Sequence, residues 1–238
     1  MSTSTRVLAV IPARGGSKGV PRKNLVQLCG RPLIAYTIGA GLSATSVSRL
    51  VVSTEDEEIA SVARSLGADV PFIRPATLAT DTAQSLPVVQ HAIQAVEDVG
   101  GTRYDVIVML QPTTPLRTAG DIDSAVALLL ESGADSVVSV VDVGGHHPYR
   151  MKRIDDDGRL VNFVEQGFED MRPRQELPPV YIRSGDIYAS RRAVIMEENT
   201  LVGENCRAIV IPESRAVNID TPIDLIRAEQ LLCGKSAH

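Results

Sequence analysis

Short runs of hydrophobic residues recur along the chain, and segments with hydrophobic residues at helical spacing separate them. A continuous hydrophobic run of four to eight residues suits a strand that is buried on both faces of a sheet, as in parallel sheets. A further strand is expected at residues 180–190, with a bend at its glycine. The runs predict buried strands at residues 7–11, 47–52, 70–73, 104–110, 136–141 and 208–212.

Helical patterns fill the intervals between these strands. On the residues alone, Asp81 is expected to cap the third helix, and an acidic residue at positions 55–56 is expected to cap the second. Alternating strands and helices predict an α/β fold with three layers and a mainly parallel sheet. The predicted helices cover residues 31–44, 57–66, 81–96, 121–132 and 224–232.

The composition changes between residues 144 and 179, where glycines, prolines and charged residues replace the hydrophobic runs. An Asp-Asp-Asp-Gly turn in this segment predicts a hairpin near residues 159–164. Such a long irregular stretch inside a compact domain usually forms a lid, an interface or a binding insertion. We therefore expect one domain, residues 1–238, with an inserted segment at about residues 143–182.

The overall composition limits the classes of protein and partner. A chain of 238 residues can bury one sizeable core. Its net charge of −5, its lack of Trp and its three Phe residues argue against nucleic-acid binding, which uses cationic and aromatic side chains. No hydrophobic run could span a bilayer, so we expect a cytoplasmic protein without a membrane partner. Cys29, Cys206 and Cys233 are widely spaced, and we expect free, reduced thiols rather than a disulfide or a zinc site.

A glycine-rich, basic loop follows the first predicted strand, and we call residues 13–25 the basic loop. Glycines allow backbone angles that other residues avoid, and they let main-chain N–H groups approach a ligand. Clustered cations suit a polyanion such as a nucleoside triphosphate, although a solvated basic turn would also fit them. The spacing matches neither a P-loop nor a dinucleotide-binding fingerprint. The glycines are Gly15, Gly16 and Gly19, and the cations are Arg14, Lys18, Arg22 and Lys23.

Two further segments carry candidate chemistry. Residues 111–117 form a proline-flanked loop at the carboxyl end of a predicted strand, where open α/β sheets keep their ligands. Near the other end of the chain, Asn218 and Asp220 occupy alternate positions and therefore face the same side. Without further information, Asp220 could equally be the cap of the last helix.

Several segments, in the same order, resemble the CMP-sugar synthetases, the acylneuraminate cytidylyltransferase family. This resemblance runs from residue 7 to residue 232 and implies a Rossmann-like nucleotidyltransferase fold. It also implies transfer of CMP from CTP to an acidic acceptor, foremost a sialic-acid-like nonulosonate, with Mg²⁺ or Mn²⁺ as cofactor. The matching segments are IPARGGSKGVPRKNL at residues 11–25, RPATLATDTAQS at 74–85, LQPTTPLR at 110–117, HHP at 146–148 and PRQELP at 173–178.

The resemblance assigns roles to individual residues, and it implies that the inserted segment forms a homodimer interface and an acceptor-binding surface. Arg14, Lys23, Gln111 and Asp220 are expected to be catalytic, and Asp220 and Asn218 to bind the metal ion. Gln111, Arg150 and Arg174 are expected to contact the acceptor. The nucleotide is expected to contact Ala13, Arg14, Gly15, Gly16, Ser17, Lys23, Asn24, Arg74, Asp81 and Thr82.

Two departures from the family pattern widen the range of possible activities. Ser184-Gly185-Asp186 stands where the sialic-acid branch typically has Asn-Gly-Ala, so the acceptor could be another acid: an ulosonic acid, a small carboxylate or a phosphonate. Asn218 stands where the family usually has Asp, which removes a negative charge from the expected metal site. The sequence is also compatible with a nucleotidyltransferase that uses UTP or a sugar 1-phosphate, and with a nucleotide-binding protein that has no activity.

Overall fold

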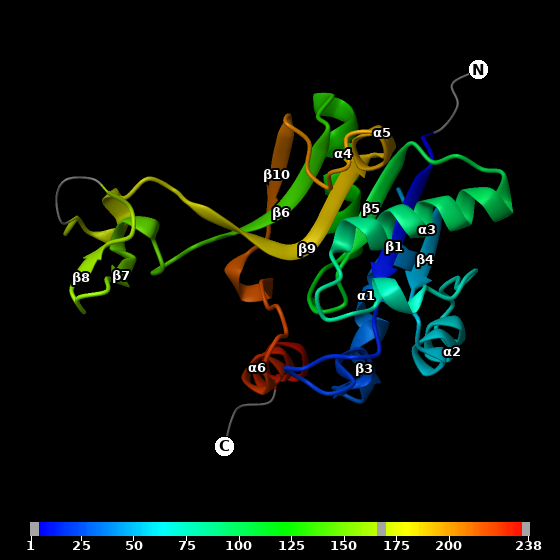
Figure 1. Cartoon of the computed structure of the whole chain (residues 1–238), viewed down its shortest axis with the longest axis horizontal. Coiled ribbons are helices and arrows are strands. Elements are labelled where there is room, and N and C mark those ends of the chain that lie inside the picture. Colours follow the sequence, from blue (N-terminus) through cyan, green and yellow to red (C-terminus); the bar gives the residue numbers. More distant parts are fainter. Residues whose placement is uncertain (1–4, 166–169, 235–238) are drawn as a thin grey trace.

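The computed structural model describes residues 5–165 and 170–234, with a six-stranded sheet at its centre (Figure 1). The strand order is β10-β6-β9-β5-β1-β4. β1 is parallel to β4 and β5, and β6 is parallel to β10, whereas β9 is antiparallel to both of its neighbours. The predicted mainly parallel α/β fold is therefore confirmed. The strands are β1 (Val7–Pro12), β4 (Arg49–Ser53), β5 (Val106–Leu110), β6 (Ser136–Asp142), β9 (Tyr181–Arg191) and β10 (Cys206–Val210).

The alternation of side chains along β1 explains why helices cover both faces of the sheet. Successive side chains of a strand point to opposite faces. Val7, Ala9 and Ile11 pack into one core, and Leu8 and Val10 pack into another, all at most 1% exposed. The first core includes α1 (Leu33–Ser43), α2 (Glu57–Ser65) and α4 (Ala119–Ser132), and the second includes α3 (Ser85–Gly100) and α5 (Arg192–Met196).

Of the two helix caps predicted from the sequence, one is confirmed and the other is wrong. The Asp56 carboxylate accepts a main-chain hydrogen bond in the first turn of α2, as expected. The predicted cap at Asp81 is wrong, because α3 begins at Ser85 and Gln84 precedes it without a side-chain cap. The Asp81 carboxylate instead forms ion pairs with two cations of the basic loop.

Residues 70–73 do not form the predicted strand. Only Asp69 bridges to Val51 of β4. Pro71 follows almost at once and has no N–H group to continue a ladder of hydrogen bonds. The hydrophobic run in this segment therefore ends in an irregular chain that leads toward the cavity described below.

Short helical segments complete the chain, and hydrophobic spacing could not predict them. α5 has five residues, which is too short for a helical period to stand out. Among the described residues, no helix combines the length and the apolar composition needed to cross a membrane. The 3-10 turns lie at Lys23–Leu25, Ala76–Leu78, Pro148–Arg150, Arg174–Glu176 and Glu213–Arg215.

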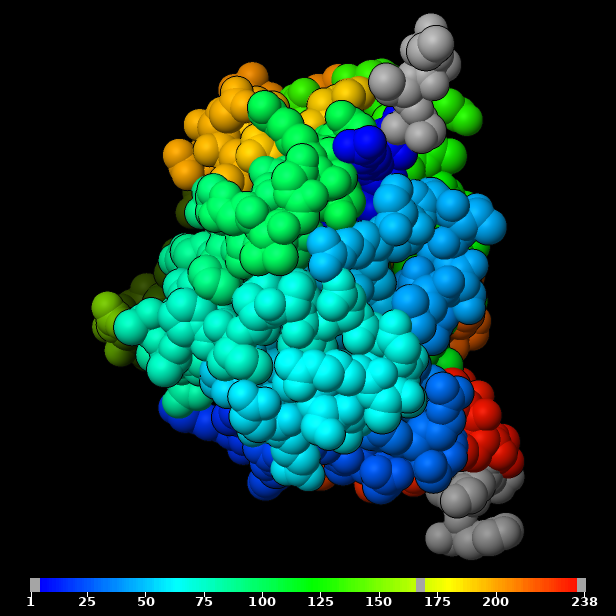
Figure 2. Space-filling view, turned by 90° about the vertical axis from the view of Figure 1, so that its right-hand side faces the viewer, coloured from blue at the N-terminus to red at the C-terminus, as the bar shows by residue number. Residues whose placement is uncertain are grey.

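The C-terminal helix α6 (Pro222–Cys233) returns to the N-terminal third of the chain. It lies beside a hairpin formed by β2 (Gln27–Leu28) and β3 (Arg31–Pro32). This hairpin replaces the predicted helical start at residue 31, because β3 pairs back onto β2. In the space-filling view, red atoms of α6 lie next to blue atoms of the N-terminal segment (Figure 2). A small third core joins them and contains Val20, Leu28, Leu33, Val217, Ile219 and Ala228.

A disulfide links Cys29 of this hairpin to Cys233 at the end of α6. The two Cα atoms are 6.1 Å apart, within the ordinary range for disulfides. The prediction that all cysteines are free is therefore wrong. The packing of α6 on the hairpin brings together residues that are 204 positions apart, and cysteine spacing cannot reveal such a contact. Cys206 is free and exposed.

Residues 143–180, which we call the arm, leave the sheet between β6 and β9 (Figure 1). Pairing between these strands continues to Asp142 and Tyr181, so the arm starts as an extension of the sheet. A hairpin of β7 (Lys152–Ile154) and β8 (Leu160–Asn162) forms around the predicted turn. Large hydrophobic side chains of the arm are exposed, namely Met151, Ile154, Leu160, Phe163 and Met171.

The disulfide predicts a thiol count and a stability change. The unfolded, unreduced protein should expose only the Cys206 thiol to a thiol reagent. Replacing Cys29 and Cys233 by serine should lower the free energy of unfolding by about 2–4 kcal/mol, because the cross-link restricts the unfolded chain. Urea unfolding measures this change, with Cys206→Ser as the control that leaves stability unaltered. Three reactive thiols would contradict the cross-link.

Candidate active site

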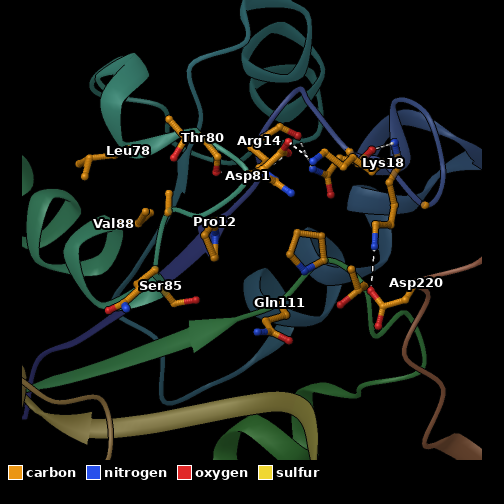
Figure 3. Close-up of a pocket in the computed structure, with 18 of the residues that line it drawn as sticks. Pro12, Arg14, Lys18, Leu78, Thr80, Asp81, Ser85, Val88, Gln111 and Asp220 are labelled. Atoms are coloured by element: carbon orange, nitrogen blue, oxygen red, sulfur yellow. Dashed lines mark hydrogen bonds and ion pairs between the residues drawn. The ribbon is translucent and has the colours of Figure 1, made fainter.

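The carboxyl ends of β1, β4 and β5 meet at one edge of the sheet, beside a cavity of about 600 Å³. Open parallel sheets bind their ligands at this edge. β9 is antiparallel to β5 and therefore begins at the same edge. Side chains line the cavity from the basic loop, from residues 74–88, from the loop after β5 and from residues 218–220 (Figure 3).

Two cations of the basic loop share one carboxylate at the cavity wall (Figure 3). Arg14 Nη1 donates to Asp81 Oδ1 at 3.1 Å and to the Thr80 carbonyl at 2.8 Å. Lys18 Nζ lies 2.7 Å from Asp81 Oδ2. The Lys18 ammonium and, more weakly, the Arg14 guanidinium lower the pKa of Asp81 below its ordinary value. Asp81 is thus the internal counter-charge of Lys18 and of Arg14, which the sequence predicts to bind the nucleotide.

Lys23 and Asp220 meet although 197 positions separate them in the sequence. Lys23 Nζ lies 3.0 Å from Asp220 Oδ1 and donates to the Ile219 carbonyl at 2.7 Å. The Lys23 side chain is 15% exposed, whereas that of Asp220 is 62% exposed. The Ser17 hydroxyl accepts a hydrogen bond from the main-chain N–H of Lys23, which holds the main chain of Lys23 in place. A predicted phosphate-binding cation and the predicted metal-binding carboxylate therefore share one cavity.

The glycines of the basic loop allow close approach rather than unusual backbone angles. None has a positive φ, and the one positive φ in this loop belongs to Arg22, at 52°. A Cβ atom on Gly19 would lie 2.1 Å from the Asp220 carbonyl oxygen, so only glycine lets the basic loop touch the C-terminal segment. The Gly15 N–H donates to Glu55 at 2.7 Å. The expectation of special backbone angles is therefore wrong for these glycines. The Gly15 N–H, which was expected to bind the nucleotide, already donates its hydrogen bond to the Glu55 carboxylate.

Arg74 is a buried cation in the cavity wall. Its residue is 4% exposed, and its Nη2 donates to Glu55 Oε2 at 2.9 Å. Burial lowers the pKa of Arg74, and the negative charge of Glu55 opposes this shift. Within the described residues, Arg74 Nε has no hydrogen-bond partner. Arg74 thus contributes a buried positive charge to the wall of the cavity, where the sequence predicts a nucleotide.

Arg22 is the one basic-loop cation that the cavity lining does not include. Its guanidinium forms ion pairs with Asp56 and Glu58 at the start of α2. The hydrogen bond from Arg22 is the main cause that lowers the pKa of Asp56. Arg22 thus fixes the basic loop on α2, whereas the other three cations line the cavity.

Gln111 follows β5, and its side chain lines the cavity (Figure 3). Its main-chain carbonyl accepts hydrogen bonds from Arg117 Nη2 and from the Thr114 hydroxyl. The Ile219 N–H donates to the Thr113 carbonyl at 2.8 Å. The loop after β5 is therefore fastened to the segment that carries Asp220.

The oxygen atoms near Asp220 fit a magnesium ion in type. Mg²⁺ usually binds one or two carboxylates of the protein and completes its shell with substrate phosphates and water. Asn218 Nδ2 donates to Asp220 Oδ2 at 2.6 Å, so the two side chains lie together as the spacing predicts. No group of three or more His, Cys, Asp and Glu side chains that could hold a metal exists in the parts of the chain described. A metal ion here would therefore depend on oxygen atoms of the substrate.

Some predicted binding residues lie outside the lining of the cavity. Arg150 donates to the Arg172 carbonyl at 2.7 Å, and Arg174 lies 3.7 Å from the Asp142 carboxylate. The arm of this chain therefore does not bring its own cations to its own cavity. The other predicted residues outside the lining are Ala13, Gly15, Gly16 and Thr82.

The structure adds residues that the sequence prediction omitted. Thr80, Gln84 and Ser85 line the cavity, the last two at the start of α3. Gln84 and Ser85 also line a second cavity, of about 320 Å³, which Arg183 of β9 borders. A polar pair at a helix start beside the carboxyl edge of the sheet is the sequence signal that could have indicated them.

Sequence and structure comparisons agree with this geometry. The family model described as Cytidylyltransferase matches residues 8–206. CMP-N,N'-diacetyllegionaminic acid synthase of Legionella pneumophila is 37% identical over 95% of this chain and 96% of its own length. Pseudaminic acid cytidylyltransferase of Campylobacter jejuni is 30% identical over 92% of each chain. The solved structure of CMP:2-keto-3-deoxy-manno-octonic acid synthetase complexed with CTP covers 97% of this chain and 99% of its own, with a TM-score of 0.72 and 18% identity.

The Rossmann-like sheet, the cavity at its carboxyl edge and these comparisons together place the chain in the nucleotidyltransferase class. Within this class, the chain belongs to the cytidylyltransferase family and resembles its CMP-sugar synthetases. The family resemblance identified from the sequence motifs is therefore confirmed.

The ion pairs of Asp81 predict the effect of removing its charge. Asp81→Asn should tighten CTP binding roughly threefold, because phosphates would no longer compete with this carboxylate for Arg14 and Lys18. Calorimetric titration with CTP at low ionic strength measures the change. Asp98→Asn, on the exposed side of α3, is the control with unchanged affinity. Weaker binding by Asp81→Asn would instead show that Asp81 contacts the nucleotide directly.

Proposed function

We propose that this enzyme transfers CMP from CTP to a hydroxyl of an acidic sugar of the nonulosonic type and releases pyrophosphate. The contact between Lys23 and Asp220 in a cavity lined by Arg14 is the observation that carries the proposal. It combines positive charge with a carboxylate, as a bound triphosphate and its cation require. The names of two relatives, which refer to legionaminic and pseudaminic acids, support this class of acceptor.

The proposed reaction is a displacement at the α-phosphorus of CTP. The acceptor hydroxyl oxygen forms the new bond to the α-phosphorus and releases its proton to solvent. The bond from the α-phosphorus to the oxygen that bridges to the β-phosphorus breaks, and its electron pair leaves with pyrophosphate. Because negative charge grows on the leaving oxygen, catalysis depends mainly on position and on nearby cations.

Residues of the basic loop would provide this charge and position. Arg14 and Lys23 would bind the phosphates, and Ser17 holds the main chain of Lys23 in place. Asn24 Nδ2 donates to the Arg14 carbonyl at 2.9 Å and so fixes the main chain of Arg14. Arg74 would contribute its buried positive charge at the cavity wall.

The C-terminal segment would supply the ligands of a cation. Asp220, with Asn218 beside it, would hold Mg²⁺ or Mn²⁺. The bound ion supplies Lewis-acid stabilisation of phosphate oxygens. The ion pair with Lys23 holds the Asp220 carboxylate at the cavity.

The acceptor would bind between Gln111 and the second cavity, since Gln84 and Ser85 line both cavities. Arg183 at the rim of the second cavity would face the acid group of the acceptor. Arg150 and Arg174 lie outside both cavities of their own chain, and we propose that the arm of a second copy brings them to the acceptor. Exposed hydrophobic side chains of the arm support such a homodimer. The cytoplasmic location stays a prediction.

Lys23→Ala tests the proposed function. We expect it to lower the rate of CTP-dependent pyrophosphate release roughly a hundredfold, by analogy with the loss of one oxyanion donor. The melting temperature should change little, because Lys23 is not a member of the three hydrophobic cores. A pyrophosphate-release assay with CTP and a panel of nonulosonic, ulosonic and small carboxylic or phosphonic acids measures the rate.

Arg103→Ala is the matched control, because Arg103 is an exposed cation whose ion pair with Glu197 lies outside the cavity lining. Its activity should equal that of the native protein. Unchanged turnover in Lys23→Ala would reject the proposed site. Release of pyrophosphate from UTP but not from CTP would reject the proposed nucleotide, and binding of CTP without release for any acid would favour a protein without activity.

Complementation tests whether the arm serves a neighbouring copy. Arg174→Glu should impair acceptor binding, and Lys23→Ala should impair turnover. Heterodimers of these two variants, purified through two different tags, should recover roughly half of the native activity, because one of their two cavities receives an intact arm. If each arm serves its own chain, the heterodimers stay inactive. Arg159→Glu, at the turn between β7 and β8, is the control for charge reversal on the arm.

A further inference from the structure

Asp186, where the sequence departs from the family pattern, is a buried carboxylate next to Gly185, which lies against the cavity residue Gln111. The residue is fully buried, and neither carboxylate oxygen has a hydrogen-bond partner in residues 5–165 or 170–234. Arg117 is 4% exposed, and its Nη1 likewise lacks a partner there. Buried ionisable groups without partners are rare and call for a physical explanation. The reaction steps proposed above use neither residue.

The other nitrogen atoms of Arg117 fasten the loop after β5 to β9. Nε donates to the main-chain carbonyl of Asp186 at 2.8 Å. Nη2 donates to the main-chain carbonyl of Gln111 and to the Thr114 hydroxyl, the latter at 2.7 Å. The Thr114 hydroxyl donates in turn to the same Gln111 carbonyl at 3.1 Å. One guanidinium therefore joins the first and fourth residues of this loop to the neighbouring strand.

The Gln111 side chain rests against the main chain of β9. Gly185 has a φ of +83°, and a Cβ atom there would lie 2.8 Å from Gln111 Oε1. Glycine at this position thus gives the Gln111 amide the space in which it lies. The strand that Arg117 fastens to the loop is the strand that supports this amide.

Charge compensation keeps Arg117 in this buried position. Burial lowers the pKa of Arg117 to about 10, and the negative charges of Asp186 and Asp121 oppose the shift. Burial also raises the pKa of Asp186, and the nearby Ser184 hydroxyl and the charge of Arg117 oppose this shift. Asp121 forms its own ion pair with Arg215, so Asp186 is the nearby carboxylate without a hydrogen-bonded partner. The hydrogen bond from Arg117 Nε to the main chain of Asp186 places these two buried ionisable residues next to each other, so loss of Arg117 removes the positive charge beside a buried carboxylate.

We propose that Arg117 is a positioning residue of CMP transfer, which clamps Gln111 onto β9 with Asp186 as its buried counter-charge. The clamp holds the Gln111 amide at the acceptor end of the cavity. This inference rests on the proposed function, because it assumes that Gln111 contacts the acceptor. It predicts that loss of the clamp impairs the use of the acceptor more than the binding of CTP.

The test separates positioning from stability by removing both charges. Arg117→Met alone should lower the melting temperature, because it leaves Asp186 buried without a counter-charge. The double variant Arg117→Met with Asp186→Leu should regain most of that stability. Its kcat/KM for the acceptor should remain roughly 10- to 100-fold below the native value, with the KM for CTP within about twofold, because Gln111 is misplaced.

Three measurements decide the outcome. Gln111→Ala should lower kcat/KM for the acceptor by a much smaller factor in the double variant than in the native protein. The reason is that loss of the clamp and loss of the Gln111 side chain act through the same amide. Amide hydrogen exchange of residues 111–117 should be faster in the double variant, a readout that needs no substrate. Arg117→Lys keeps the charge but loses the planar fork, and it should resemble the double variant in acceptor kinetics while staying folded.

A matched pair of charges serves as the control. Glu97 of α3 and Arg192, the first residue of α5, form an ion pair, and their side chains are 13% and 15% exposed. Replacing them by Leu and Met should leave the acceptor kinetics and the exchange of residues 111–117 unchanged. Native acceptor kinetics and native loop exchange in the Arg117–Asp186 double variant would overturn the clamp. Absence of CTP-dependent pyrophosphate release in the native protein would reject the proposed function instead. The amide hydrogen exchange of residues 111–117 would then be the measurement that decides whether Arg117 clamps the loop.

Discussion

The site depends on one contact, in which the Lys23 ammonium meets the Asp220 carboxylate and the Ile219 carbonyl. These groups come from opposite ends of the chain. Their meeting requires a glycine at position 19, a third hydrophobic core and a helix that returns to the N-terminal hairpin. Much of the molecule outside the central sheet therefore serves to bring one cation and one anion to the same cavity.

Before a ligand enters, carboxylates of the chain already neutralise the cations around this cavity. Asp81 pairs with two of them, Asp220 with a third, and Glu55 with Arg74. This arrangement reduces the repulsion that a cluster of like charges would otherwise create. A phosphate-bearing ligand must exchange places with some of these carboxylates, so its affinity reflects a difference between two sets of ion pairs rather than a simple sum of attractions.

The sequence predicted the sheet well because buried strands show as continuous hydrophobic runs, and β1, β4, β5 and β6 all do so. It also predicted that Lys23 and Asp220 belong to one site, because family motifs carry both. It failed where long-range packing decides. The Cys29–Cys233 disulfide, the pairing of Asp81 with the basic loop and the burial of Asp186 beside Arg117 all depend on segments far apart in the sequence. Local patterns in the sequence therefore cannot predict these contacts.

The pairing of β6 with β9 at the base of the arm has a consequence for how this protein can diversify. Val140, Val141 and Asp142 pair with residues 181–183, so the same two strands that bear the arm continue into the central sheet. The hairpin tip can therefore change in length or composition while the strands, and the nucleotide half of the cavity, keep their register. The fold thus separates a projecting segment that can vary from the sheet edge that carries the cavity.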